Sequence, residues 1–414
     1  MPLSFFIRTR VSCSPLIERA CIPSAHQASR VQNGEQKAGI PGQGEKVLSA
    51  LNEDKCEALN FGINYGMVAN NLPTPADVVT LLQAICVSKA KLYDADRSVL
   101  STFTNTGISF IVGIPNQELG ALASASQAFQ WVQENVAAHL PDTHISAIVV
   151  GNEIFSTNDT TLMGQVLPAM RNIYLALSLL NLHHDIIVST AHSFSIVTTS
   201  YPPSSGQFNP AIATTYMKPM LEFLSKTKAP FFINVYPFFP YKENPKMIPI
   251  EYALFKPNPG VQDPKTSLHY TNMFDAQLDA VYFAIEALGY HNITLLVSET
   301  GWPSAGDENE VGANIENAKV YHQNLMKHIS LQHGTPLHPN TSLEVYFFAL
   351  FNEDMKPGPG SERNYGLFKP DGTMVYEFQF FNQPNASSSC SSLHFVFTLF
   401  LYFPTLMHLI HFHL

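Results

Sequence analysis

The chain has 414 residues, of which 45% are hydrophobic and only 14% are charged, and its formal net charge is -10. This length is enough for one large domain or two ordinary ones. The acidic balance argues against nucleic acid as a partner, because phosphate binding needs a basic face. The five cysteines are irregularly spaced and show no zinc-binding pattern, so we expect neither a disulfide framework nor a metal site.

The two ends of the chain differ from the rest. Residues 1–60 are polar and lack the periodicity of a helix or a strand, so we expect a disordered extension. The apolar run Ser4 to Ile7 is shorter than the core of about 7–15 residues that a secretory signal needs. Residues 384–414 form a small polar spacer and an apolar tail, Leu393 to Leu414. This order is typical of a glycosylphosphatidylinositol (GPI) anchor signal, and a tail-anchoring membrane helix is the alternative.

Between these ends, strand-like and helix-like patterns alternate over residues 61–383. We expect eight strands, at residues 61–66, 90–95, 109–115, 146–153, 185–192, 231–237, 294–299 and 343–353. Apolar spacing near 3.6 predicts helices at residues 75–85, 119–140, 161–182, 214–227, 273–289 and 314–329. Pro75 after Thr74 is a favourable helix start, whereas Pro168 and Pro219 should kink or delay their helices.

This alternation predicts an α/β fold, a (β/α)8 TIM barrel that forms a single catalytic domain. A doubly wound open sheet is the alternative, and it usually carries a glycine-rich phosphate turn after its first strand. Here the first strand ends in Asn64-Tyr65-Gly66, and neither that turn nor a P-loop occurs in the sequence. We therefore expect no cofactor.

Two of the predicted strands end in a glutamate, in SAIVVGNE (Ser146–Glu153) and in LLVSETGWPS (Leu295–Ser304). A carboxylate at the exit of a buried strand is costly unless it has a function. Active sites of TIM barrels lie at the carboxyl ends of the strands, so Glu153 on the fourth strand and Glu299 on the seventh should face one cleft. A pair of carboxylates is the machinery of glycoside hydrolysis. We expect Trp302 to be exposed beside them, as a platform for a sugar ring.

Six segments of the chain together resemble, in this order, the plant glucan endo-1,3-beta-glucosidases of glycoside hydrolase family 17: GINYG, KLYDAD, VVGNE, NVYPFF, VSETGWPS and FALFNEDMK. The resemblance covers residues Phe61 to Phe381 and rests on the ordered set, since GNE alone is a weak signal. It implies a (β/α)8 barrel that cleaves β-1,3-glucan (callose) with retention of configuration. A C-terminal anchor signal is also common among the plant members.

The resemblance also implies roles for the residues at the strand ends. Glu299 matches the nucleophile, which must be ionised, and a carboxylate that caps the following loop is the alternative. Glu153 matches the general acid/base, whose pKa should be raised by burial and by a neighbouring negative charge; the alternative is a solvated loop acid. Asn152 matches a residue that holds the sugar 2-hydroxyl, unless it serves only the turn.

Further residues are expected to support this pair. Glu353 and Lys356 match a supporting acid and base, and a lysine near Glu299 would keep that carboxylate ionised; an ordinary surface ion pair is the alternative. Four aromatic residues lie at strand ends, each with core packing as the alternative: Tyr65, Tyr93, Tyr236 and Trp302. Tyr236 is well placed to bind the nucleophile or a sugar hydroxyl. The segment with Phe238, Phe239 and Tyr241 either lines a glucan groove or forms a rigid loop.

The leading hypothesis is an endo-hydrolase of β-1,3-glucan that acts as a monomer, GPI-anchored at the plasma membrane or in the cell wall. Four glycosylation sequons, at Asn158, Asn292, Asn340 and Asn385, fit a secreted glycoprotein. A non-catalytic callose-binding wall protein and a β-1,3-glucan transglycosylase are the alternatives. The intact glutamate pair argues against the first, whereas the second shares every catalytic residue. Roles in defence, at plasmodesmata or in wall remodelling all stay open.

Overall fold

The computed structural model describes residues 61–378, and eight strands in this range close into a parallel barrel. They are β1 (Phe61–Asn64), β2 (Lys89–Lys91), β3 (Ser109–Ile114), β4 (His144–Asn152), β5 (Ile187–Ser193), β8 (Phe231–Asn234), β11 (Leu295–Thr300) and β12 (Glu344–Phe347). Each barrel strand pairs with the barrel strands before and after it in the chain, and β12 closes on β1. The predicted TIM barrel and its eight strands are confirmed.

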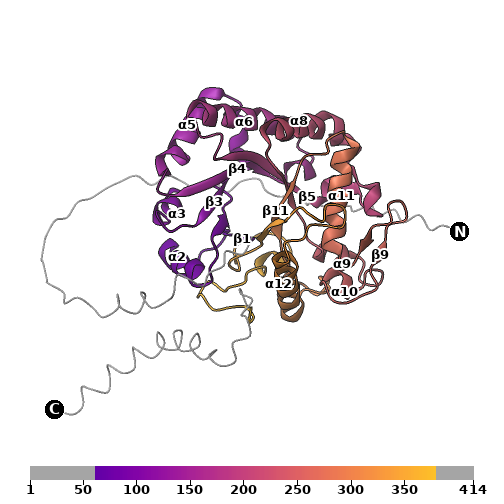
Figure 1. Cartoon of the computed structure of the whole chain (residues 1–414). Helices are drawn as coiled ribbons and strands as arrows, with labels where there is room; N and C mark the ends of the chain where they lie inside the picture. The colour runs from indigo at the N-terminus through magenta and orange to yellow at the C-terminus, as the bar shows by residue number, and fades with distance from the viewer. Residues whose placement is uncertain (1–60, 379–414) are drawn as a thin grey trace, which may run out of the picture. The chain divides into compact units, whose positions relative to one another are not determined.

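Helices connect the barrel strands and surround them (Figure 1). The longer helices are α2 (Pro75–Ala84), α5 (Ala125–Asn135), α6 (Thr160–Leu179), α8 (Lys218–Thr227), α11 (Met273–Ala287) and α12 (Ile315–Ser330). The shorter ones are α3 (Arg97–Thr102), α4 (Leu119–Leu122), α7 (Pro210–Ile212), α9 (Phe238–Glu243) and α10 (Ile250–Ala253). Two small hairpins, β6 (Val197–Thr199) with β7 (Gln207–Phe208) and β9 (Val261–Gln262) with β10 (His269–Tyr270), follow β5 and β8.

The helix boundaries differ from the predicted ones where local chemistry interrupts the pattern. The predicted helix 119–140 is divided into α4 and α5 at Ser124, whose backbone is extended (ψ 126°). The helix α2 begins at Pro75 as predicted, and the Thr74 side chain accepts a hydrogen bond from the Asp77 amide. Pro219 lies in the first turn of α8, where its missing N–H costs little. Pro168 lies inside α6, which continues to Leu179.

Apolar side chains from six strands fill part of the barrel interior and hold the strands in place. This cluster consists of Ile111, Ala147, Val149, Ala191, Phe232, Leu296 and Tyr346. Every residue of β8 and β11 is buried, as expected of parallel strands covered on both faces. Each large side chain buried in this way stabilises the fold by about 1.5–3 kcal/mol. The carboxyl ends of the strands therefore project from a rigid support.

The expectation for the cysteines needs a correction. Cys86, which follows the C-cap residue Ile85 of α2, is disulfide-bonded. The other four cysteines all lie outside residues 61–378. An odd count and irregular spacing argue against a framework of several bridges, but they do not argue against a single bond.

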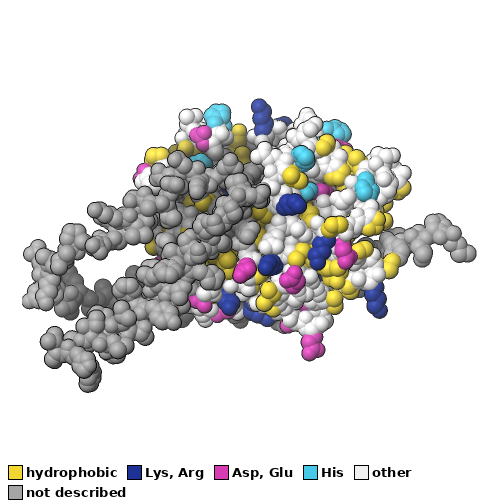
Figure 2. Space-filling model, turned by 60° about the horizontal axis from the view of Figure 1, so that its bottom comes forward, with side chains coloured by type: hydrophobic (Ala, Val, Ile, Leu, Met, Phe, Trp, Pro, Cys, Tyr) yellow, Lys and Arg dark blue, Asp and Glu magenta, His cyan; other side chains and the backbone are white. Residues whose placement is uncertain are grey.

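The predictions for residues 1–60 and 384–414, including the anchor signal, lie outside the described residues. Within residues 61–378, no helix is both long and apolar enough to cross a membrane. On the face drawn in Figure 2, acidic and basic side chains of the described part are intermingled, and they form no continuous basic surface there. The part of that face that is visible in Figure 2 therefore lacks the charge pattern that a nucleic acid needs.

Candidate active site

The carboxylate of Glu299, in the seventh barrel strand, is held by a cation and a phenol. Lys91 Nζ donates to Glu299 Oε1 over 2.8 Å, and the Tyr236 hydroxyl donates to Oε2 over 2.9 Å. The Lys91 and Glu299 side chains are only 1% and 8% exposed. Burial by itself would raise the pKa of Glu299, but the charge and the hydrogen bond of Lys91, together with smaller contributions from Tyr93 and Lys356, outweigh it and lower that pKa. Glu299 is therefore ionised.

The backbone around Glu153, just after the fourth barrel strand, is in an unusual conformation. Glu153 has a φ of 54° and Gly151 a φ of 73°, both in the left-handed region. The side chain of Asn116 binds the Asn152 backbone on both sides, accepting from its N–H over 2.8 Å and donating to its carbonyl over 3.0 Å. The Glu153 amide donates to the Ala191 carbonyl over 2.8 Å. These bonds stabilise a conformation that few non-glycine residues adopt.

The electrostatic surroundings of Glu153 are opposite to those of Glu299. Its Oε1 accepts a hydrogen bond from Asn234 Nδ2 over 2.9 Å. Burial, and then the negative charge of Glu299, raise the pKa of Glu153 to about 7. The Asn234 hydrogen bond and the Lys91 charge act in the other direction but do not cancel the increase. The site thus contains one carboxylate kept ionised and one carboxyl that holds a proton near neutrality, which is the division of roles that acid/base chemistry needs.

The structure pairs Lys356 with Glu353 instead of placing it against Glu299. Lys356 Nζ lies 3.5 Å from Glu353 Oε2 and 4.0 Å from the centre of the Phe348 ring. Glu353 is 3% exposed, and its Oε1 accepts from the Val68 amide over 2.8 Å, so this is not an ordinary surface pair. The positive charge of Lys356 still helps to lower the pKa of Glu299, although less than Lys91 does.

Three of the four predicted strand-end aromatics are tyrosines, and two of them lie at the glutamate pair. Tyr93 donates to Asn64 Oδ1 over 3.1 Å, and its ring centre lies 4.2 Å from Lys91 Nζ. Tyr236 contacts the nucleophile candidate directly, as described above. Tyr65 is only 2% exposed and packs edge-on against Phe351, which fits core packing better than contact with a substrate.

The prediction of an exposed Trp302 is wrong. Trp302 is completely buried, its Nε1 donates to the Gly312 carbonyl over 2.8 Å, and its ring packs against Tyr321. A satisfied N–H allows the indole of Trp302, which belongs to the loop after β11, to lie in the core. Phe238 is buried against it, whereas Phe239 is 36% exposed and contacts the Tyr236 ring. The exposed aromatic beside the site is therefore Phe239.

Asn152 has a polar atom that the protein leaves without a partner. Its Oδ1 is buried and makes no hydrogen bond with any described residue. A buried acceptor without a partner is costly unless a ligand or a water supplies the donor. Since Asn152 directly precedes Glu153, this atom fits a contact with a substrate hydroxyl.

Sequence reasoning missed two residues that touch the glutamate pair, Lys91 and Asn234. Both lie in apolar strands, in AKLYDA and FFINVYP. The argument that singled out the strand-end glutamates, that a polar group in a buried strand needs a reason, applies equally to both residues. Both belong to the segments KLYDAD and NVYPFF that carried the family resemblance.

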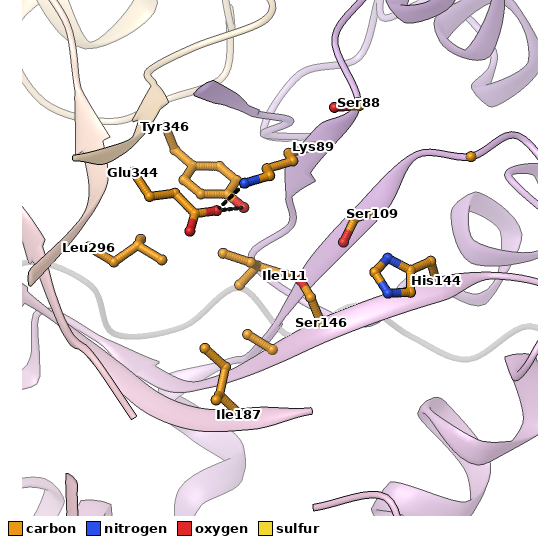
Figure 3. A pocket seen from close by; sticks show the side chains of 12 residues that line it. Ser88, Lys89, Ser109, Ile111, His144, Ser146, Ile187, Leu296, Glu344 and Tyr346 are labelled. Atoms are coloured by element: carbon orange, nitrogen blue, oxygen red, sulfur yellow. Dashed lines mark hydrogen bonds and ion pairs between the residues drawn. The ribbon is translucent and has the colours of Figure 1, made fainter. Parts of the chain in front are cut away.

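A cavity lies at the opposite, amino-terminal end of the barrel (Figure 3). This cavity has a volume of about 430 Å³ and is lined by residues at the starts of the strands, including Lys89, His144 and Glu344. Glu344 Oε1 accepts from Lys89 Nζ over 2.8 Å and from the Tyr346 hydroxyl over 3.3 Å. Because its charged groups neutralise each other and catalysis in this fold occurs at the other end, the cavity is not the candidate active site.

Comparisons with known proteins agree with the geometry. The sequence profile described as "Glycosyl hydrolases family 17" matches residues 61–380. Glucan endo-1,3-beta-glucosidase 14 of Arabidopsis thaliana is 50% identical over 324 residues, which cover 78% of this chain and 82% of that protein. Glucan endo-1,3-beta-glucosidase 11 of the same plant is 50% identical over 323 residues, covering 78% and 76%.

Solved structures are similar as well. CJP38, a beta-1,3-glucanase and allergen of Cryptomeria japonica pollen, superposes with a TM-score of 0.75 at 43% identity, covering 78% of this chain and 99% of that one. One of two plant beta-glucan endohydrolases with distinct substrate specificities gives a TM-score of 0.71 at 37% identity, covering 77% and 99%. The barrel, its glutamate pair and these matches lead to one conclusion: the chain belongs to glycosyl hydrolases family 17.

Proposed function

We propose that this protein hydrolyses internal linkages of β-1,3-glucan, with Glu299 as the nucleophile and Glu153 as the general acid/base. The observation that carries the proposal is the opposite perturbation of two glutamates at the carboxyl ends of β4 and β11: the pKa of Glu299 is lowered and that of Glu153 is raised to about 7. The substrate is inferred from the relatives, whose names specify endo-1,3-beta-glucosidases.

In the first step, the Glu153 proton moves to the glycosidic oxygen while the bond from that oxygen to the anomeric carbon breaks. The Glu299 carboxylate forms a bond to the anomeric carbon from the opposite face. Lys91 and Tyr236 keep this carboxylate ionised and oriented before the reaction. Asn152 Oδ1 is proposed to accept a hydrogen bond from the sugar 2-hydroxyl, a contact that strengthens in the transition state.

In the second step, water attacks the anomeric carbon, and the bond to Glu299 breaks. Glu153, now a carboxylate, takes the proton from the attacking water and returns to its starting form. Two inversions give a product with the configuration of the substrate. A pKa near 7 suits this exchange, because the group must both give and take a proton at the working pH.

Product analysis on a linear β-1,3-glucan tests the proposal. The wild-type protein should release a series of short oligosaccharides whose new reducing ends first appear as the β-anomer in NMR, and Glu299→Gln should release none. Products longer than the substrate would indicate a transglycosylase. A folded protein that binds the glucan and leaves it unchanged would indicate the non-catalytic wall protein.

We also propose, from the sequence pattern of residues 384–414, that the protein carries a GPI anchor on the outer face of the plasma membrane. Treatment of membranes with a phosphatidylinositol-specific phospholipase C should release the protein. Deletion of Leu393 to Leu414 should give the same soluble form. Membrane retention after both treatments would contradict the anchor.

A further inference from the structure

A hydrogen-bonded chain of two buried side chains leads to the acid/base. Ser298 Oγ donates to Asn234 Oδ1 over 2.6 Å, and Asn234 Nδ2 donates to Glu153 Oε1 over 2.9 Å. Ser298 is 0% and Asn234 1% exposed, so water does not compete with either bond. Ser298 directly precedes Glu299 in β11, and Asn234 pairs with Glu299 in the sheet. The chain therefore runs from the backbone of one glutamate to the carboxyl of the other.

The direction of these bonds follows from the donors. In the structure the amide oxygen of Asn234 faces Ser298 and accepts from its hydroxyl. The NH2 group of the same amide faces Glu153 and donates to its Oε1. An amide nitrogen only donates, so Glu153 Oε1 must accept and cannot carry its proton toward Asn234.

We propose that Asn234, oriented by Ser298, is a positioning residue that keeps Oε1 of Glu153 unprotonated, so that Oε2 carries the proton to the glycosidic oxygen. The inference rests on the proposed function, because it specifies which atom acts as the acid. In the first step the proton leaves Oε2 for the departing oxygen, which takes the electrons of the broken bond. In the second step Oε2 receives a proton from the attacking water.

The same contact influences when Glu153 is protonated. A donor next to a carboxylate favours its ionised form, and the Asn234 hydrogen bond lowers the pKa of Glu153 against the effects of burial and Glu299. Loss of the amide should therefore raise that pKa and move the alkaline limb of the pH profile upward. A residue that only supported the fold would lower the rate without moving this limb.

Two substrates separate positioning of the acid from general damage to the site. A laminari-oligosaccharide needs a proton on its leaving oxygen, whereas a 2,4-dinitrophenyl laminaribioside has a leaving group that needs none. We expect Asn234→Ala to lower kcat/KM on the oligosaccharide about 10- to 100-fold, the factor for a hydrogen bond to a charged group. The rate constant of the pre-steady-state burst of dinitrophenol should change less than about threefold, which is a shift in activation free energy below 1 kcal/mol. Ser298→Ala should act in the same direction more weakly, which keeps the test usable if Asn234→Ala folds poorly.

The matched control is Asn64→Ala. Asn64 is also a fully buried amide, and its Nδ2 donates to the carbonyls of Ser298 and Phe347 instead of to a carboxylate. The Asn64→Ala variant should lower the rates on the two substrates by the same factor. Equal losses on both substrates in Asn234→Ala, or a downward shift of its alkaline limb, would overturn the inference. A wild-type protein inactive on the oligosaccharide would instead refute the proposed function.

Discussion

Lys91 on β2 and Glu299 on β11 form a buried ion pair, with Nζ 2.8 Å from Oε1, although β1 and β12 lie between their strands in the barrel. Such a pair is weak evidence for stability, because removing both charges from water costs about as much as their attraction returns. Its use here is electrostatic: it permits an ionised carboxylate in a buried place. The pair explains why a lysine interrupts the apolar strand AKLYDA.

Replacement of Lys91 by methionine should therefore impair catalysis more than it impairs folding of the site. Without the cation, the pKa of Glu299 rises, so the acid limb of kcat/KM should move to higher pH, and the maximum should fall about 10- to 100-fold. Lys89→Met is the matched control, because Lys89 lies two residues earlier and pairs with Glu344 at the other end of the barrel. The measurement is kcat/KM as a function of pH for both variants. Similar profiles for the two variants would refute the role given to Lys91.

The pH dependence of kcat/KM of the wild-type protein should show the titration of both glutamates. Activity requires Glu153 with its proton, so kcat/KM should be lost as pH rises through about 7. It also requires Glu299 without a proton, so activity should persist on the acid side until pH falls through the lowered pKa of that group. In Glu299→Gln the neighbouring charge is gone, and the pKa of Glu153 should fall. An NMR titration of labelled glutamate checks this; an unchanged value would mean that the two carboxyls do not interact.

The tyrosine hydroxyl on Glu299 should contribute measurably to the rate. Tyr236→Phe removes the donor to Oε2 and leaves the ring in place, and we expect a loss of about 10-fold in kcat/KM. Tyr65→Phe is the comparison, since Tyr65 packs in the core against Phe351. Steady-state kinetics with both variants would contradict the assignment if Tyr65→Phe were the more damaging change.

Trp302 and Phe239 should respond to mutation in different ways. Trp302→Ala removes a fully buried indole and should lower the free energy of unfolding by about 3–5 kcal/mol. Phe239→Ala removes a side chain that is 36% exposed, so it should weaken glucan binding with a much smaller change in stability. Denaturant unfolding and glucan affinity, measured on both variants, distinguish these effects. A stable Trp302→Ala protein with reduced affinity would restore the sugar-platform hypothesis.

Much of this arrangement follows from local sequence patterns, and the remainder depends on contacts across the barrel. Strand ends and the places of Glu153 and Glu299 could be predicted, because apolar runs and their polar termini are visible in short windows. The partner of Glu299 could not be predicted in this way, because Lys91 lies 208 positions away and reaches Glu299 only once the barrel closes. Burial of Trp302 likewise depends on the Gly312 carbonyl, which no short window around Trp302 reveals.

Covalent trapping of the nucleophile is the most direct test of the glutamate pair. The protein should be incubated with a 2-deoxy-2-fluoro laminaribioside that carries a good leaving group, and the labelled peptide identified by mass spectrometry. The proposed mechanism predicts one added glycosyl group per chain, attached to Glu299. A label on another residue, or turnover of the glucan with no trapped intermediate under conditions that exhaust the reagent, would contradict the mechanism.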